Sequence, residues 1–231
     1  KDLTGTNLSG ADLSYANLTG VDLSGKDLTG INLMAANLTN VDLSGKDLTG
    51  TNFSGANLFD VNLSGSDLSN ANLNSAILVD TILLNANLQN ADLRNVILDD
   101  TGMESSILSG VDLSGKDLTG TNLSGADLSY TNLSGQDLSG RNLTGANLTG
   151  AFLFGTTLAG ADLSYTSLPY AYLSGKDLTG TNLSGADLSY ANLDGVDLSG
   201  KDLTGTILKG VDLSYKDLTG TNLSGADLSY A

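Results

Sequence analysis

Leucine recurs at every fifth residue along the whole chain. Forty-six pentads, beginning KDLTG, TNLSG and ADLSY, fill positions 1–230 without an insertion or deletion. The third position of each pentad is Leu, apart from Phe53 and Met103. The second position is mostly Asp or Asn, the fourth mostly Ser or Thr, the fifth mostly Gly, and the first usually Ala, Thr or Val. A polar–apolar pattern with a five-residue period therefore organises the entire sequence.

A period of five matches neither the 3.6 residues of an α-helical turn nor the two-residue alternation of a long strand. The many Gly, Asn, Asp and Ser residues also disfavour a helix. We therefore expect a short extended piece in each pentad, with its third residue pointing inward, followed by a corner. Successive coils would pair their backbones at a spacing of about 4.8 Å. The pattern predicts a solenoid whose core is a column of Leu side chains.

The sequence resembles the pentapeptide-repeat family, whose motif is A(D/N)LXX. The stretch KDLTGTNLSGADLSYA both opens and closes the chain, and matches to the motif cover essentially its whole length. The resemblance implies an all-β fold, a right-handed quadrilateral β-helix with four pentapeptides per coil. On that basis 231 residues form roughly 11.5 coils and a rod of about 55 Å. We expect one continuous β-helix over 1–231, either open-ended or a segment of a longer array.

Lysine at the first position departs from the small residues that the family prefers there. We expect each Lys stem to line the wall of the coil while its ammonium reaches solvent beside a carboxylate, because a buried unpaired charge is costly. A local distortion that turns the corner outward is the alternative. The residues concerned are Lys1, Lys26, Lys46, Lys116, Lys176, Lys201 and Lys216.

Composition narrows the classes of function. The chain has no Cys or His, which removes thiol nucleophiles, Cys/His zinc sites and Ser-His-Asp triads. Its net charge of −16 disfavours nucleic acid as a direct ligand. No apolar run approaches the ~20 residues of a membrane helix, so we expect no membrane insertion. A filled solenoid without long loops has no catalytic cleft, and we predict neither enzymatic activity nor a cofactor.

Aspartates 20 residues apart would stack on one side of such a coil, as Asp2, Asp22 and Asp42 do. Stacked carboxylates raise the question of bound Ca²⁺, which needs six to eight oxygen ligands. Each stack offers only one carboxylate per coil. We therefore favour a structural role, in which each Asp or Asn accepts a backbone N–H at its own turn.

Residues 76–110 loosen the pattern by placing apolar residues at outward positions. Exposed apolar clusters often mark association surfaces, although β-branched residues could simply strengthen the extended segments. The pentad TGMES at 101–105 departs furthest from the motif and is expected to form a bulge. The candidate interaction patch comprises Phe59, Ile77, Val79, Ile82, Leu84 and Ile97.

Residues 151–172 gather aromatic side chains at outward positions. Such a platform suits sugar rings or a protein partner, but an aromatic ladder without a ligand is the simpler interpretation. The candidate aromatic patch comprises Phe152, Phe154, Tyr165, Tyr170 and Tyr172.

These features favour a non-catalytic structural or binding solenoid. It would serve as a stiff spacer, associate with a protein partner or with itself by end or lateral stacking, and act in adhesion. An extracellular or cell-surface location is favoured over the cytoplasm. The alternative is an acidic DNA mimic that binds DNA gyrase, as some members of the resembling family do. B-DNA of about 55 Å would carry about 32 charges, twice the net charge of this chain. Ice or carbohydrate binding is a weaker alternative.

Overall fold

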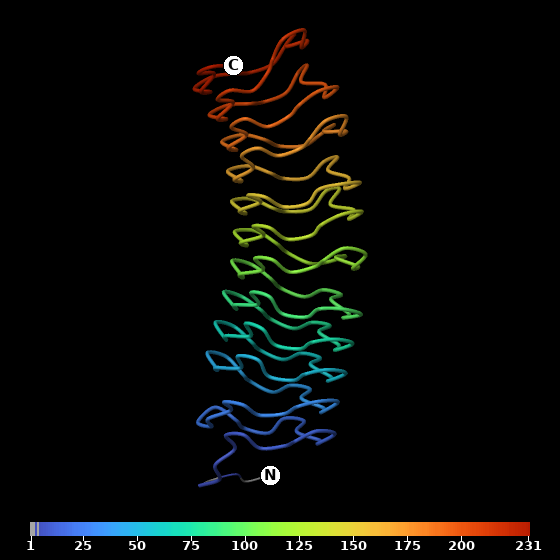
Figure 1. Cartoon of the computed structure of the whole chain (residues 1–231), viewed down its shortest axis with the longest axis vertical. Coiled ribbons are helices and arrows are strands. Elements are labelled where there is room, and N and C mark those ends of the chain that lie inside the picture. The colour runs from blue at the N-terminus through green and yellow to red at the C-terminus, as the bar shows by residue number, and fades with distance from the viewer. Residues whose placement is uncertain (1–2, 4) are drawn as a thin grey trace. The chain divides into compact units, whose positions relative to one another are not determined.

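The computed structural model describes Leu3 and residues 5–231, which form an N-terminal unit, Lys1–Asn122, and a C-terminal unit, Leu123–Ala231. Throughout the described residues there is no helix and no extended strand; the regular structure consists of isolated parallel β-bridges. In each unit the backbone winds through successive coils (Figure 1). Each bridge joins second-position residues 20 apart, such as Asn32 to Asn52 and Asn147 to Ser167. This architecture agrees with the all-β prediction.

Backbone hydrogen bonds follow the pentad. The third-position amide of Leu33 donates to the second-position carbonyl of Asn52 on the next coil, at 2.9 Å. The first-position amide of Ala36 donates to the carbonyl of Leu33 at 3.1 Å and closes a turn. The second-position amide of Asn57 donates back to Ala36 at 2.9 Å. Backbone groups are therefore paired within and between coils without a long strand, as buried backbone requires.

The corner of the pentad lies at its fifth position, where the backbone takes a positive φ. Gly150 has φ 68° and Asn40 has φ 59°, values that suit the third residue of a type II turn. Glycine reaches this region without steric cost, and Asn and Asp enter it more readily than other residues. The tyrosines that adopt it are Tyr15, Tyr130, Tyr165, Tyr170, Tyr190, Tyr215 and Tyr230.

At several corners the side chain leans over the glycine at the corner of the next coil. A Cβ atom added to Gly150 would lie 2.7 Å from Cε1 of Tyr130, and one on Gly185 would lie 2.5 Å from Cδ1 of Tyr165. The Asp100 side chain covers Gly120 in the same way. A large residue at one corner thus occupies the space that a side chain at the next corner would need.

The interior of each unit is filled by the third and first positions. Leu33, Leu38 and Phe53 are fully buried, and Ala36 lies beside them. Burial of each large side chain contributes about 1.5–3 kcal/mol, so the stability of a unit grows with the number of coils. The inward orientation of the first and third positions is as the resemblance implied.

Several threonines at buried first positions hydrogen-bond their hydroxyls to a third-position carbonyl, whereas the buried hydroxyls of Thr51 and Thr121 have no such partner among the described residues. Oγ1 of Thr81 donates to the carbonyl of Leu58, and Oγ1 of Thr101 to the carbonyl of Leu78, both at 2.8 Å. The third-position carbonyl of one coil therefore accepts a side chain from the next coil.

The pentad TGMES is a regular part of the N-terminal unit, so the prediction of a bulge was wrong. Gly102 bridges both Ile82 and Asn122, and Met103 is fully buried in the Leu column. Glycine fits the second position because the bridge uses only backbone atoms.

Five first-position lysines direct their ammonium groups to backbone carbonyls of the preceding coil rather than to carboxylates: Lys26, Lys46, Lys176, Lys201 and Lys216. Lys1 lies outside the described residues. Nζ of Lys26 lies 2.5 Å from the carbonyl of Leu3, and Nζ of Lys201 lies 2.5 Å from that of Leu178. Nζ of Lys46 lies 3.0 Å from the carbonyl of Lys26. These heads use first- or third-position carbonyls of the preceding coil, Lys46 also uses the carbonyl of Ser24, and the stems stay half-buried. The expected pairing with carboxylates was wrong for these residues.

Burial without a carboxylate partner lowers the pKa of Lys176. Its ammonium donates to the carbonyl of Thr156 at 2.9 Å, and desolvation by the coil wall lowers the pKa of Lys176 below its usual value. A half-buried lysine is tolerated at the first position because the carbonyl solvates its charge.

We predict that Gly150→Ala destabilises the chain more than Gly200→Ala. Both glycines have positive φ, 68° and 65°, so each substitution brings a conformational cost of about 1–2 kcal/mol. Only the Cβ at position 150 also meets a ring, that of Tyr130. Urea unfolding of both variants measures the difference.

The double variant Tyr130→Gly with Gly150→Ala serves as the control, because it removes the ring that the new Cβ meets. It should bring the cost of Gly150→Ala close to that of Gly200→Ala. Equal costs for the two single variants would contradict the proposed contact between successive corners.

Candidate binding surfaces

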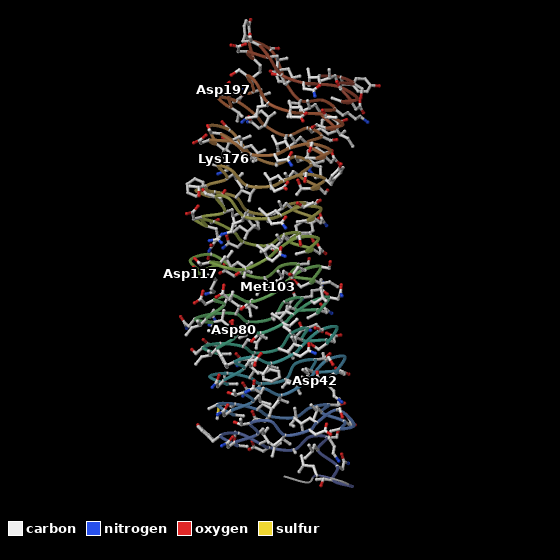
Figure 2. All side chains as sticks on the ribbon, turned by 180° about the vertical axis from the view of Figure 1, so that it is seen from behind. Asp42, Asp80, Met103, Asp117, Lys176 and Asp197 are labelled. Atoms are coloured by element: carbon white, nitrogen blue, oxygen red, sulfur yellow. The ribbon has the colours of Figure 1, made fainter. Side chains whose placement is uncertain are left out.

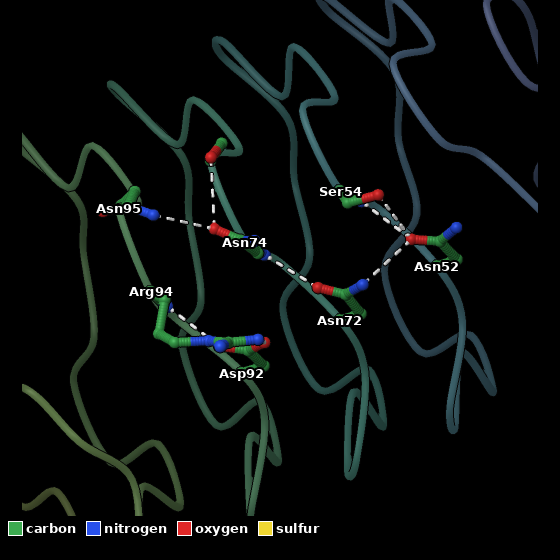
Figure 3. A network of polar contacts seen from close by, with 8 residues as sticks. Asn52, Ser54, Asn72, Asn74, Asp92, Arg94 and Asn95 are labelled. Atoms are coloured by element: carbon green, nitrogen blue, oxygen red, sulfur yellow. Dashed lines mark hydrogen bonds and ion pairs between the residues drawn. The ribbon is translucent and has the colours of Figure 1, made fainter.

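The outward second position is held by a local hydrogen bond. Oδ1 of Asp42 accepts the backbone N–H of Ser44 at 2.9 Å, and Oδ1 of Asn52 accepts that of Ser54 at 3.1 Å. The Ser54 hydroxyl donates to the same oxygen at 2.7 Å (Figure 3). The prediction that Asp and Asn accept an N–H at their own turn is therefore confirmed.

Side chains at the second position also connect successive coils. Nδ2 of Asn72 donates to Oδ1 of Asn52 at 3.3 Å (Figure 3), and Nδ2 of Asn32 donates to Oδ1 of Asp12 at 3.0 Å. An Asn above an Asp thus supplies a donor where a second carboxylate would repel the first. Polar side chains line the outside of the coils (Figure 2).

Hydrogen bonding from the fourth position lowers the pKa of most second-position aspartates. Asp137 is the extreme case, because the hydroxyls of Thr157 and Ser139 and the Ser139 amide lower its pKa to about 2. The others with a lowered pKa are Asp12, Asp22, Asp27, Asp42, Asp47, Asp92, Asp162, Asp177, Asp197, Asp202, Asp212, Asp217 and Asp227. These carboxylates are ionised at neutral pH.

Like charges one coil apart oppose this effect. The carboxylate of Asp22 acts to raise the pKa of Asp42, but hydrogen bonds from Ser44 outweigh it. Among the described residues, no group of three or more His, Cys, Asp or Glu side chains is arranged to hold a metal ion.

The apolar residues singled out in the N-terminal unit lie on successive coils. Bridges align Asn57 with Ile77 and Ile77 with Ile97, and Phe59 and Val79 occupy the fourth positions of the first two of these pentads. Phe59 is 40% and Ile97 49% exposed. We call Phe59, Ile77, Val79 and Ile97 the apolar patch.

Ile82 and Leu84 lie across the next corner from the apolar patch, 46% and 40% exposed. Their pentad follows that of Val79 directly, and a bridge aligns Ile82 with Asn62. The six residues predicted as an interaction patch are therefore brought together on two adjoining sides.

The corner between these two sides is acidic, which the search for apolar residues missed. Asp60, Asp80 and Asp100 occupy it on successive coils, and Asp80 is labelled in Figure 2. The amide of Asp60 donates to Val79 at 3.2 Å and that of Asp80 to Asp99 at 3.3 Å, which fixes the register. In the described part of the chain, none of these three carboxylates forms an ion pair. The signal was present in the sequence as Asp at a 20-residue spacing. We call these three residues the acidic corner.

The residues of the candidate aromatic patch lie at or beside two corners of the C-terminal unit. The rings of Tyr170 and Tyr190 stack, with centroids 5.2 Å apart and planes 9° from parallel. Phe152, Phe154 and Tyr172 belong to pentads that follow this corner, and are 60%, 86% and 70% exposed. Tyr165 lies one corner away and covers Gly185 instead. Tyr190 was missed because it belongs to an otherwise regular block.

A hollow of about 400 Å³ lies beside Lys176 and Lys201 in the C-terminal unit, with Asp177 and Asp197 in its lining. Within the described ladder, Asp177 and Asp197 form no β-bridge. Basic and acidic groups alternate around the hollow, so it offers no field of one sign to a charged ligand.

The repeat, its inward Leu column and its bridged coils define the protein class, and comparison with known families agrees. The sequence profile described as "Pentapeptide repeats" matches in eight copies, at residues 2–30, 17–55, 31–70, 62–101, 106–140, 142–175, 168–200 and 202–231. The chain therefore belongs to the pentapeptide-repeat family, and the resemblance inferred from its motif is confirmed. Pentapeptide-repeat proteins are right-handed β-helices.

Solved structures of the same family are similar to this chain. HetL, a pentapeptide repeat protein involved in heterocyst differentiation regulation from the cyanobacterium Nostoc sp. strain PCC 7120, is 32% identical, with 96% of this chain and 82% of HetL covered and a TM-score of 0.33. A trypsin-treated form of QnrB1, a plasmid-mediated fluoroquinolone resistance protein, is 23% identical, with 89% of each chain covered and a TM-score of 0.48. No curated protein matches the chain. No helix in the described residues is long and apolar enough to span a membrane.

We predict that the free energy of unfolding is lost in acid. The lowered pKa of Asp137, about 2 against 3.8 in the unfolded chain, means that ionised Asp137 contributes stability above pH ~4. That contribution declines as the pH falls through the folded value near 2, and the other lowered aspartates act in the same direction. Urea unfolding followed by circular dichroism between pH 6 and pH 2, roughly the window in which carboxylates titrate, measures the decline. A stability maximum below pH ~3 would contradict this assignment.

Proposed function

We propose that this chain is a non-catalytic binding solenoid that engages a protein partner through the apolar patch. The observation that carries the proposal is the exposure of Phe59 and Ile97 in that patch, 40% and 49%, with Ile82 and Leu84 also exposed across the next corner, 46% and 40%. In most other pentads the second position holds Asp or Asn and the fourth holds Ser or Thr, and these pentads form the same turns. The apolar replacements at these positions therefore add exposed apolar surface without a need of the fold, as association surfaces do.

The solenoid suits this role because its turns are short and its coils are hydrogen-bonded to one another. A partner meets a preformed surface, which lowers the ordering cost of association. We further propose that the solenoid has a four-sided cross-section with roughly 11.5 coils for its 231 residues, and that it also serves as a structural spacer. End-to-end self-assembly is a further form of that structural role.

A photo-crosslinking amino acid placed at Phe59 should capture a partner protein from extracts of the source cells. The captured partner is then purified, and the complex is reconstituted from the two purified proteins. The same group at Ser199, a fourth position without apolar neighbours, is the matched control. Ile77→Asn with Ile97→Asn returns both positions to the residue that Asn57 holds in the same column, and should abolish capture. Crosslinking at Phe154 alone would move the site to the aromatic patch, and discrete filaments without any crosslink would favour self-assembly.

A second candidate is an acidic DNA mimic that binds a DNA-binding enzyme such as DNA gyrase. Its support is the net charge of −16, carried by aspartates that are ionised at neutral pH. Interleaved lysines and a charge about half that of B-DNA of the expected length weigh against it.

Inhibition of gyrase supercoiling at low salt tests the second candidate. If mimicry holds, the chain inhibits the enzyme, and the inhibition weakens steeply as salt rises. Asp177→Asn, Asp197→Asn and Asp217→Asn together should weaken it further. Unchanged supercoiling at micromolar protein would remove this candidate.

A further inference from the structure

We propose that the segment bound at the apolar patch is a cationic amphipathic helix. Its apolar face would cover Phe59, Ile77, Val79 and Ile97, and one flank of Lys or Arg side chains would lie over the acidic corner. This inference rests on the proposed function and deepens it by assigning the chemistry of the partner. It follows from the position of charge beside apolar surface on successive coils.

Adjacency is set by the pentad. Phe59 directly precedes Asp60, and Val79 directly precedes Asp80, so each apolar side chain lies next to a corner carboxylate. The bridges that align Asn57, Ile77 and Ile97 keep these pairs on consecutive coils. The surface is therefore a strip, with an apolar band along one side and a row of carboxylates along its edge.

Spacing favours a helix laid along the stack of coils. Coils repeat at about 4.8 Å, and an α-helix presents one face every 5.4 Å, roughly its pitch. Over the two steps from Asp60 to Asp100 the mismatch is only about 1.2 Å. Lys and Arg side chains are long and flexible enough to absorb it. Basic residues at positions i, i+4 and i+7 of a helix would each meet one carboxylate.

The unpaired carboxylates of the strip favour a bound segment with positive charge. Asp99 adds a fourth carboxylate beside the acidic corner, and none of the four is in an ion pair within the described residues. Arg94 forms an ion pair with Asp92 at 2.6 Å on another side of the coil. Lys116 is half-buried one coil beyond the end of the strip. A cationic segment is therefore attracted, whereas a second copy of this chain, with net charge −16, is repelled.

Both components are needed for a specific site. Exposed ion pairs contribute only about 0.2–1 kcal/mol each, which alone gives weak binding of any cation. Apolar contact over the band adds affinity and orients the helix, while the row of carboxylates sets its rotation about its own axis. This division of roles is what the experiment measures.

The probe is a synthetic peptide of about five helical turns, capped at both ends, with Leu on one face and Lys at i, i+4 and i+7 along one flank. We expect binding measured by fluorescence anisotropy and helix formation by circular dichroism. A peptide of the same composition in scrambled order, and one with Glu in place of Lys, should each bind about tenfold more weakly or less.

Protein variants identify the site. Asp60→Asn, Asp80→Asn and Asp100→Asn together should weaken binding of the Lys peptide about tenfold at low salt. Asn is tolerated at this corner, because Asn40 holds it with φ 59°. The matched control is Asp177→Asn, Asp197→Asn and Asp217→Asn, which changes the net charge equally but lies in pentads whose fourth positions are the polar Thr179, Ser199 and Thr219, and should have little effect. Ile77→Asn with Val79→Ser and Ile97→Asn should abolish binding, with circular dichroism confirming that each variant is folded.

Equal weakening by the two aspartate sets would overturn the proposal, because the peptide would then be recognising net charge alone. Self-association that disappears in Ile77→Asn with Ile97→Asn would overturn it in favour of a second copy. If crosslinking at Phe59 captures a partner whose contacting segment is neither helical nor basic, the inference fails while the proposed function stands. If nothing crosslinks at Phe59, both fail.

Discussion

The left-handed corner at every fifth residue is the constraint on which the rest of the structure depends. It turns the chain after one extended triplet, so the third-position side chain points inward and the second-position amide faces the neighbouring coil. Without it the 20-residue bridge spacing is lost, and with it the column of buried Leu. Glycine dominates the position for this reason, and Asn40 and Asp60 hold it with φ values of 59° and 54°. The hydrogen bonds between coils therefore depend on the positive φ at each corner.

The same constraint separates folding from recognition. Most of the stability resides in the backbone ladder and in the buried first and third positions, whereas the second and fourth positions face solvent and add local hydrogen bonds. Ile77 can replace an Asn in its column because the bridge is made by backbone atoms alone, and Gly102 demonstrates the same tolerance at the other extreme. A surface can therefore change its chemistry coil by coil while the register is preserved. The apolar patch and the acidic corner are products of this freedom.

Periodicity in the sequence was sufficient for much of the fold. The five-residue period predicted the inward Leu residues and the turns held by second-position side chains, because each depends on local steric and hydrogen-bonding preferences. The lysines were misjudged because their partners are carbonyls 20 or 23 residues away, and backbone acceptors leave no trace in the sequence. TGMES was misjudged because its unusual composition was taken as a sign of irregular backbone. The apolar residues of the candidate site were identified, but the acidic corner was overlooked because Asp is common throughout the chain.

The way Tyr130 covers Gly150 has a consequence for how this sequence varies. A bulky residue at one corner excludes a Cβ twenty residues later, so the two positions are not independent. Tyr165 with Gly185 repeats the relation, and Tyr170 escapes it only because its neighbour Tyr190 offers a parallel ring. The residues tolerated at one corner therefore depend on the residue at the same corner of the neighbouring coil, 20 positions away, rather than on adjacent residues in the chain. A block copied in whole coils carries its compatible partners with it, while one copied out of phase brings rings into conflict with side chains.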